Sequence, residues 1–224
     1  MKQIPLAIGA EAEHRFDNFV PGANAAALAH LVALAAPGAP VYLWGESGSG
    51  KTHLLAALAR RFQDDGAKVC WYRAGSAEPL AAEDDWTLLV LDDCDRLDPA
   101  EQLAAFSAFV RAAANGAVVA AAGRVPPVDL PLREDLRTRL GWGHVFALQP
   151  LAEADVRAAL RREADRRGVF LSDEVMDHLL TRFPRDLKHL MALLDRLDEF
   201  SLSRARQITV PLLKTMLAEE GAPS

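Results

Sequence analysis

The sequence predicts an α/β domain built on a parallel sheet, followed by a smaller all-helical domain. Short apolar runs alternate with helical segments as far as Pro150, which is the pattern of a parallel sheet covered by helices on both faces. After Pro150 only helical periodicity remains, and half of the 224 residues are hydrophobic, enough for a sizeable core. We therefore divide the chain into a flexible arm (1–15), an α/β domain (16–150) and a helical domain (151–224).

Five short apolar runs predict the strands of the sheet. Each has the length of a buried strand, and the fourth consists of small residues. In chain order they are VYLW (41–44), KVCWYRA (68–74), WTLLVLDD (86–93), AVVAAAG (117–123) and HVFALQ (144–149). Because strands and helices alternate, we expect a five-stranded parallel sheet.

Helices of the α/β domain are predicted from their periodicity and their start and stop residues. We expect them over residues 24–36, 51–64 and 99–115. The first ends at Pro37-Gly38, and the last begins with Pro99, where no amide donor is needed.

The helical domain is predicted to contain four helices. They are expected over residues 152–168, 172–183, 185–200 and 209–217. Ser172 and Thr209 are suitable N-caps, Gly168 ends the first helix, and the third helix carries its leucines on one stripe.

Composition and charge argue against several classes of protein. The formal net charge of −6 disfavours binding of nucleic acid over the whole surface, although it is compatible with a local basic patch. Cys70 and Cys94 form no CxxC pair and suggest no disulfide framework, which is typical of a reducing cytosol. No apolar run reaches the roughly 18 residues of a membrane span. We therefore expect a cytoplasmic protein without a membrane partner.

A phosphate-binding loop is the strongest functional signal. GESGSGKT, from Gly45 to Thr52, fits the pattern G-x-x-x-x-G-K-[ST] and lies between an expected strand and an expected helix. Glycines let several backbone amides face one anion, and the helix N-terminus adds its positive end. Lys51 would reach the β- and γ-phosphates, and Thr52 would hold Mg²⁺. The alternative is a glycine-rich turn with a chance lysine, which the flanking strand and helix disfavour.

The second half of such a site is an acidic residue at the end of an apolar strand, and LLVLDD provides it. Asp92 would lie at the C-terminal end of the strand and bind Mg²⁺, directly or through water. Asp93 could polarise the attacking water. The alternative for Asp93 is that it only caps the next turn.

The order of motifs resembles the AAA+ ATPases, and within them the DnaA-like replication proteins. FDNFVPGANAAALAHLVALA resembles the DnaA segment that runs past the adenine, DLRTRLGWG (135–143) resembles the arginine-finger box, and FPRDLKHLMALLDRLD resembles the start of the lid helix. This resemblance covers residues 16–215 and implies an AAA+ P-loop core with an all-α lid. It implies an arginine finger at Arg139, acting in trans, and a sensor-2 arginine at Arg185.

With the resemblance, the predicted ligand is ATP or ADP together with Mg²⁺. The predicted nucleotide-binding residues are Gly45, Glu46, Ser47, Gly48, Ser49, Gly50, Lys51, Thr52, His53 and Arg185. A surface ion pair with Glu134 or Asp135 is the alternative role for Arg139, and a solvated helix end is the alternative for Arg185. The five arginines between Arg157 and Arg167 alternate with acidic residues, which favours a charged solvated face over a DNA site.

The arm begins with MKQIPLAI, in which Gln3, Leu6 and Ile8 fit the pattern Gln-x-x-aliphatic-x-aliphatic of peptides that dock on the bacterial sliding clamp. Pro5 restricts the unbound peptide and so lowers the cost of ordering it. An edge strand or a disordered tail is the alternative. With this arm and without a DNA-binding tail, the chain resembles the Hda family, the regulatory inactivators of DnaA.

Two departures from the family pattern predict weak hydrolysis by the chain itself. Asp93 stands where many AAA+ proteins have Glu, and Arg124 stands where the family usually offers a polar sensor. The expected protein is therefore a regulator that binds adenine nucleotide and stimulates ATP hydrolysis in DnaA, in which Arg139 and Asp93 are the predicted catalytic residues.

The predicted partners are DnaA and the β subunit of the DNA polymerase sliding clamp, with DNA contacted only through the clamp and a homo-oligomer left open. A helicase-loader or transposition-helper ATPase acting on DNA is the main alternative function. A nucleotide-bound adaptor without a catalytic contribution is the other.

Overall fold

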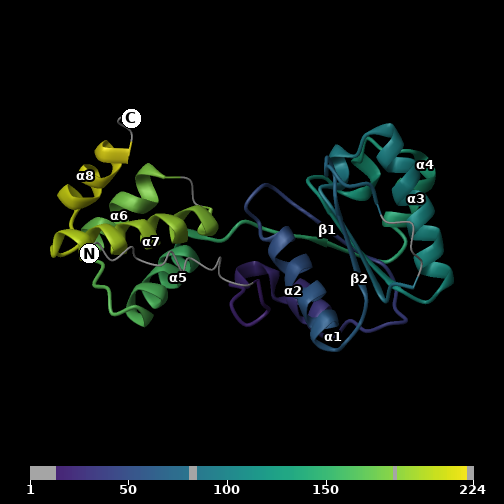
Figure 1. Cartoon of the computed structure of the whole chain (residues 1–224), viewed down its shortest axis with the longest axis horizontal. Coiled ribbons are helices and arrows are strands. Elements are labelled where there is room, and N and C mark those ends of the chain that lie inside the picture. Colours follow the sequence, from purple (N-terminus) through teal and green to yellow (C-terminus); the bar gives the residue numbers. More distant parts are fainter. Residues whose placement is uncertain (1–13, 81–84, 184–185, 221–224) are drawn as a thin grey trace, which may run out of the picture. The chain divides into compact units, whose positions relative to one another are not determined.

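The computed structural model describes residues 14–80, 85–183 and 186–220. Two compact units are formed within these residues (Figure 1). The first contains residues 14–19, 25–45 and 50–148, and the second contains 20–24, 46–49 and the residues from Gln149 onward. The domain borders expected at residues 15 and 150 stay predictions.

A five-stranded parallel sheet forms the centre of the first unit, as predicted. The strands are β1 (Val41–Trp44), β2 (Val69–Arg73), β3 (Leu88–Asp92), β4 (Val118–Gly123) and β5 (His144–Ala147). Their order across the sheet is β2-β3-β4-β1-β5. The carboxyl ends of all strands therefore meet at one edge, where Arg73 is paired in register with Asp92 and Trp44 with Gly123.

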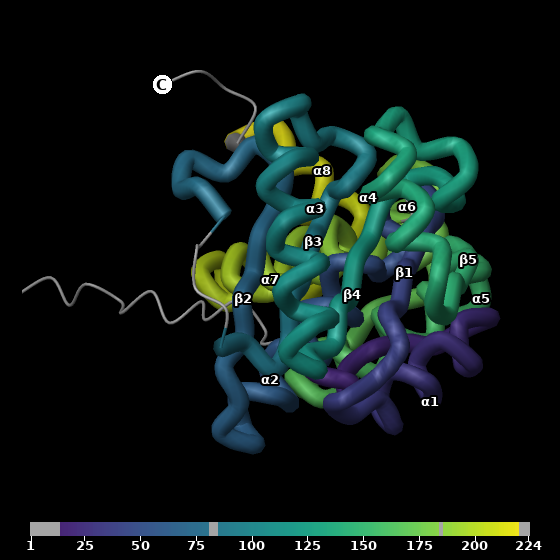
Figure 2. The backbone as a smooth tube through the Cα atoms, turned by 90° about the vertical axis from the view of Figure 1, so that its right-hand side faces the viewer, coloured from purple at the N-terminus to yellow at the C-terminus, as the bar shows by residue number. Residues whose placement is uncertain are grey.

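Helices cover both faces of this sheet (Figure 2). Those of the first unit are α1 (Ala25–Ala33), α2 (Lys51–Asp64), α3 (Pro99–Ala114) and α4 (Glu134–Leu140). The short 3₁₀ helices η2 (Cys94–Arg96) and η3 (Pro127–Asp129) precede α3 and α4. α1 and α2 pack on one face and α3 and α4 on the other. Successive side chains of a strand point to opposite faces of the sheet, so Leu89 and Leu91 pack on the side of α3, whereas Leu88 and Val90 pack on the side of α2.

Two expectations for this unit are corrected. α1 ends at Ala33 instead of residue 36, because the residue before Pro37 is restricted to extended conformations and the chain leaves the helix ahead of it. The second correction concerns residues 134–140, for which no helix was predicted from the sequence and which form α4. Leu136 and Leu140, one turn apart, are both buried and fix this short helix to the core.

The second unit is helical, as predicted. Its elements are η1 (Gly22–Asn24), α5 (Glu153–Arg166), α6 (Asp173–Arg182), α7 (Leu187–Arg204) and α8 (Val210–Glu220). Ser172 caps α6 by accepting a hydrogen bond from the amide of Val175 at 3.3 Å. α7 continues beyond residue 200, where it was expected to end, because the chain leaves the helical conformation only at Ala205, with φ +50°.

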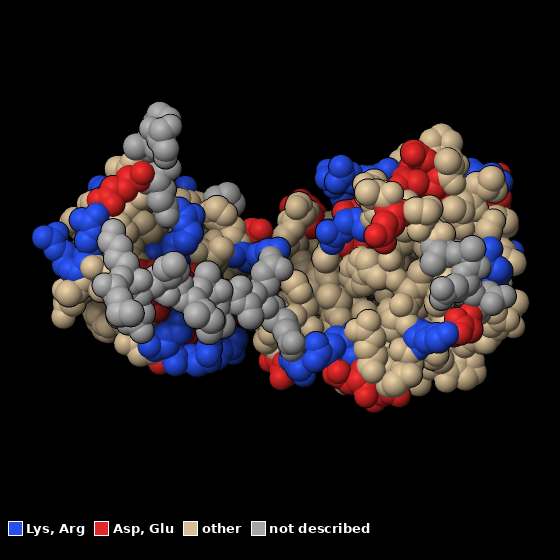
Figure 3. All heavy atoms as spheres, in the orientation of Figure 1, with Lys and Arg blue, Asp and Glu red and all other residues tan. Residues whose placement is uncertain are grey.

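Several charged side chains lie in pairs of opposite sign. On the face of the first unit seen in Figure 3, basic and acidic groups adjoin one another instead of forming one large basic patch. In the second unit, Arg157 pairs with Asp177 at 2.5 Å and Arg161 with Asp173 at 2.6 Å. These contacts agree with the charged solvated face that the sequence favoured. Among the described helices, none is long and apolar enough to cross a membrane.

Candidate functional site

Glycines shape the turn between β1 and α2. Gly45 has φ +153° and its amide donates to the carbonyl of Gly123 at 3.3 Å, which ties the loop to the carboxyl end of β4. Gly50 is the N-cap of α2 with φ +95°, in the left-handed region. A Cβ atom at this position would lie 2.7 Å from Cε2 of Phe19. Only glycine therefore fits here without movement of the Phe19 ring.

Lys51 is held inside the first turn of α2. Its side chain is buried, with 8% exposure, and Nζ donates to the carbonyl oxygen of Gly45 at 2.7 Å. Burial lowers the pKa of Lys51, whereas the carboxylates of Asp92 and Asp93 oppose this shift. The ammonium group is thus positioned beside the loop in which the phosphates are predicted to bind.

Thr52 and Asp92 bring two oxygen atoms together at the sheet edge. Thr52 Oγ1 donates to Asp92 Oδ2 at 2.9 Å, and Asp92 is buried, with 1% exposure. Hydroxyl and carboxylate oxygens are the ligands that Mg²⁺ prefers, so this pair fits the predicted ion chemically. Within the described part of the chain, no group of three or more His, Cys, Asp or Glu side chains could hold a metal. Mg²⁺ binding stays a prediction.

Asp93 adopts an uncommon backbone conformation directly after β3. Its φ is +57°, and it is the N-cap of η2, yet its side chain makes no capping hydrogen bond. Its amide donates to Asp92 Oδ1 at 3.0 Å, and its carboxylate is partly exposed beside Arg73. The capping role considered for Asp93 is therefore not the one seen here.

Arg73 is the one member of this cluster that the sequence reasoning missed. It lies at the end of β2 and places its guanidinium on Asp92, with Nη2 2.6 Å and Nε 3.2 Å from Oδ2. Nη2 also lies 3.5 Å from Thr52 Oγ1, and Nε lies 3.6 Å from Asp93 Oδ2. The hydrogen bond to Asp92 raises the pKa of Arg73. The signal in the sequence was that Arg73 and Asp92 each lie near the carboxyl end of a predicted strand, and the observed pairing of β2 with β3 places them side by side.

His53 and Arg124 have partners of their own. His53 Nε2 lies 2.9 Å from the carbonyl oxygen of Arg15, and its ring contacts Phe19 at a centroid distance of 5.3 Å. Burial lowers the pKa of His53. Arg124 pairs with Asp95, whose Oδ2 lies 3.6 Å from Arg124 Nε. The nucleotide contact predicted for His53 stays a prediction.

The other residues of the predicted loop, Glu46 to Ser49, belong to the second unit. Glu46, Ser47 and Gly48 are exposed, and the amide of buried Ser49 donates to the carbonyl of Glu46 at 3.3 Å. The predicted residues Gln3, Leu6, Ile8 and Arg185 lie outside the described residues.

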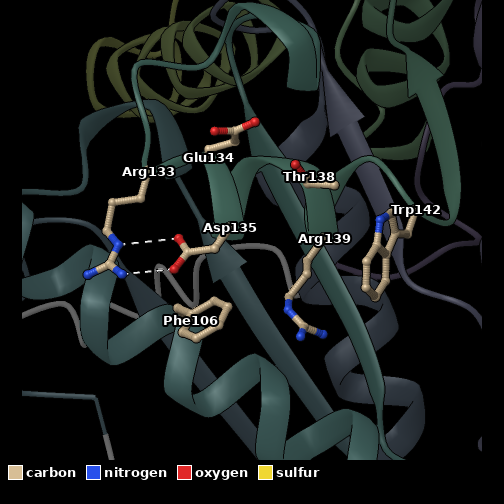
Figure 4. A pocket seen from close by; sticks show the side chains of 7 residues that line it. All are labelled: Phe106, Arg133, Glu134, Asp135, Thr138, Arg139 and Trp142. Carbon is tan, nitrogen blue, oxygen red and sulfur yellow. Dashed lines mark hydrogen bonds and ion pairs between the residues drawn. The ribbon is translucent and has the colours of Figure 1, made fainter.

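Arg139 lies on α4 in a hollow of about 670 Å³. Its guanidinium carbon lies 4.8 Å from the ring centre of Trp142 and 5.3 Å from that of Phe106. Figure 4 shows the side chain projecting between these rings. Asp135, one of the carboxylates considered as its partner, is instead bound by Arg133 at 2.8 and 3.2 Å. The aromatic rings hold Arg139 through cation–π contacts, and none of the described residues accepts a hydrogen bond from its N–H groups, which can serve another acceptor.

The first unit thus brings together Lys51, Thr52, Asp92 and Asp93 at one end of the sheet, with Arg73 added to them. Such a cluster can neutralise phosphate charge and hold or replace a divalent ion. Arg139 belongs to the opposite face of the sheet from α2, since α4 packs with α3 and α2 packs with α1. Its guanidinium is therefore part of a second, separate site.

Family models match two stretches of the chain. Residues 153–217 match the model described as Hda, lid domain, and residues 10–76 match the model of the bacterial DnaA ATPase domain. The second match includes the predicted phosphate loop, and the first includes α5, α6, α7 and most of α8.

Solved structures share the fold. Domain III of the Thermotoga maritima replication initiation protein DnaA is 20% identical, with a TM-score of 0.75, over 95% of this chain and 98% of that one. AMPPCP-bound DnaA from Aquifex aeolicus is 20% identical, with a TM-score of 0.69, over 84% of this chain and 65% of that one. The Thermotoga maritima RuvB Holliday junction branch migration motor is 18% identical, with a TM-score of 0.60, over 85% of this chain and 64% of that one.

Proposed function

Since this chain is an Hda/DnaA-like AAA+ protein and a DnaA-related replication regulator, we propose that it stimulates the hydrolysis of ATP bound to DnaA. In this proposal the chain binds ATP or ADP in its own site and docks on the sliding clamp through its arm. Arg139 of this chain acts on the ATP bound in the site of DnaA. The result is a smaller amount of DnaA that can initiate replication.

The environment of Arg139 is the observation that carries this proposal. The side chain is presented by α4, which Leu136 and Leu140 fix to the core, its aromatic neighbours contact it, and the nearby Asp135 is bound by Arg133. A guanidinium held in this way is suited to stabilise charge on the γ-phosphate of a neighbouring subunit. Because α4 and α2 pack on opposite faces of the sheet, Arg139 serves a partner's nucleotide more readily than the chain's own.

Binding of adenine nucleotide is proposed from the loop and its surroundings. Gly45 and Gly50 have the backbone that a phosphate cradle needs, and Lys51 is anchored beside it. The Aquifex aeolicus relative was solved with AMPPCP, which supports the same class of ligand for this chain. Arg73 on Asp92 supports weak hydrolysis by the chain itself, because Asp92 is the predicted Mg²⁺ ligand and its Oδ2 is already bound by Arg73.

Docking on the sliding clamp is proposed from the sequence of the arm. Gln3 can form hydrogen bonds with the clamp, and Leu6 and Ile8 can fill an apolar cleft. Tethering on the clamp would raise the local concentration of this chain near DnaA on DNA, without any new contact to DNA itself.

The proposal is tested by measuring release of phosphate from ATP-loaded DnaA. The four conditions are DnaA alone, DnaA with this chain, DnaA with clamp loaded on DNA, and all components together. We expect acceleration only when the chain and the loaded clamp are both present. Equal rates with and without the chain would reject the proposed function, and acceleration by DNA without the clamp would favour a loader-type ATPase.

A further inference from the structure

The Arg73 side chain occupies the oxygen atoms that a divalent ion would use. Register in the parallel sheet pairs Arg73 of β2 directly with Asp92 of β3, so both side chains emerge on the same face at the same level. Arg73 Nη2 then reaches Asp92 Oδ2 at 2.6 Å and Thr52 Oγ1 at 3.5 Å. The pairing of β2 with β3 therefore places the Arg73 guanidinium next to the Asp92 carboxylate.

Both oxygens of Asp92 are hydrogen-bonded in this arrangement, and Oδ2 is the more heavily used. Oδ2 accepts hydrogen bonds from Thr52 Oγ1 and from both Nε and Nη2 of Arg73. Oδ1 accepts from the backbone amide of Asp93 at 3.0 Å. Asp92 is 1% exposed, so its negative charge is neutralised by these groups and not by water. A small ion that needs near-octahedral oxygen ligands must therefore compete with Arg73 for Oδ2 of this carboxylate.

We infer that Arg73 is a built-in counter-cation that competes with Mg²⁺ for Asp92 and Thr52. This inference rests on the proposed function, since it concerns the nucleotide site of the chain. Its consequence is that ADP binds almost as well without Mg²⁺ as with it. The chain then holds nucleotide as a structural ligand, while the metal-dependent arrangement needed for hydrolysis is disfavoured.

Exposure of the guanidinium explains why competition, and not permanent blockage, is expected. The Arg73 side chain is 46% exposed, whereas that of Asp92 is 0% exposed. Arg73 can therefore move into solvent at modest cost, and its contact with Asp93 at 3.6 Å offers an intermediate position. A high concentration of Mg²⁺ is expected to displace it. If the pair were only structural, removing Arg73 would change stability but not the dependence on Mg²⁺.

The experiment measures the dissociation constant of ADP by calorimetry in excess Mg²⁺ and in excess EDTA. The full chain is compared with R73A and R73Q, because glutamine keeps a hydrogen-bond donor for buried Asp92 if the alanine variant fails to fold. R60A is the matched control, since Arg60 also forms a partly exposed ion pair with a carboxylate, Asp64, at 2.9 Å. Binding of Mn²⁺ in the presence of ADP, followed by electron paramagnetic resonance, gives a readout of the metal itself.

For the wild-type chain and R60A, we expect the two dissociation constants to agree within about threefold. For R73A and R73Q, we expect Mg²⁺ to tighten ADP binding by about tenfold or more, with a matching gain in Mn²⁺ affinity. If the Mg²⁺ dependence of these variants equals that of the wild-type chain, the inference is wrong while nucleotide binding stands. If the wild-type chain binds no ADP under either condition, the proposed nucleotide site itself is refuted.

Discussion

Replacing Gly50 by alanine separates backbone strain from steric overlap at the start of α2. Gly50 has φ +95°, and an added Cβ would lie 2.7 Å from Phe19 Cε2. Gly66, which follows α2, has φ +78° and no atom within 4 Å of an added Cβ. The G66A variant therefore measures the cost of the left-handed backbone alone, about 1–2 kcal/mol.

For G50A, the same strain is joined by displacement of the Phe19 ring, and overpacking of this kind costs about 1–3 kcal/mol more. We expect a total loss of about 2–5 kcal/mol in the free energy of unfolding. Because His53 contacts the same ring at 5.3 Å, the disturbance extends into the first turn of α2. ADP affinity should fall in G50A and stay near the wild-type value in G66A.

Urea unfolding followed by tryptophan fluorescence is a suitable assay, since all four tryptophans of the chain lie within residues 44–142 of the first unit. The difference in the free energy of unfolding between G50A and G66A measures the cost of displacing Phe19, because both variants share the cost of the left-handed backbone. Equal losses of stability in G50A and G66A would show that the contact with Phe19 has no energetic weight.

Three further predictions concern nucleotide, clamp and pH. K51A should abolish ADP binding measured by calorimetry in a folded protein, and an unchanged dissociation constant would remove Lys51 from the site. Q3A combined with L6A should remove clamp binding in surface plasmon resonance at unchanged thermal stability, whereas loss of stability would place the arm in the core. Burial, followed by the charge of His144, lowers the pKa of His30 below 6.5. As the pH falls, His30 is therefore protonated in the unfolded chain at a higher pH than in the folded chain. The free energy of unfolding should fall as pH drops below about 6.5, and less steeply in H30Q.

Most of the fold could be predicted from the sequence because its signals are local. β1 and α2 have the bounds expected from VYLW and from the glycine loop ahead of Lys51. α4 was missed because seven residues with only two core leucines, Leu136 and Leu140, give too few turns for a clear periodicity. Its helical character depends on packing against α3, which a single segment does not report.

The site was predicted in part. Lys51, Thr52 and Asp92 were found from motif spacing, and their proximity follows from the strand–loop–helix context. Arg73 was overlooked because its partner is 19 positions away and is reached only through sheet register. The aromatic surroundings of Arg139 depend likewise on where α3 and α4 meet, which spacing along the chain does not encode.

Phosphate release from ATP-loaded DnaA, with DNA-loaded clamp and the R139A variant, tests the trans mechanism most directly. Arg137, two residues away on the same helix, supplies the matched control R137A. We expect R139A to bind ADP and clamp like the wild-type chain but to lose stimulation by about 10³–10⁵-fold, or completely where the wild-type stimulation is smaller. R137A should retain most of the stimulation. Stimulation by R139A equal to that of the wild-type chain would show that Arg139 is not the arginine acting on DnaA.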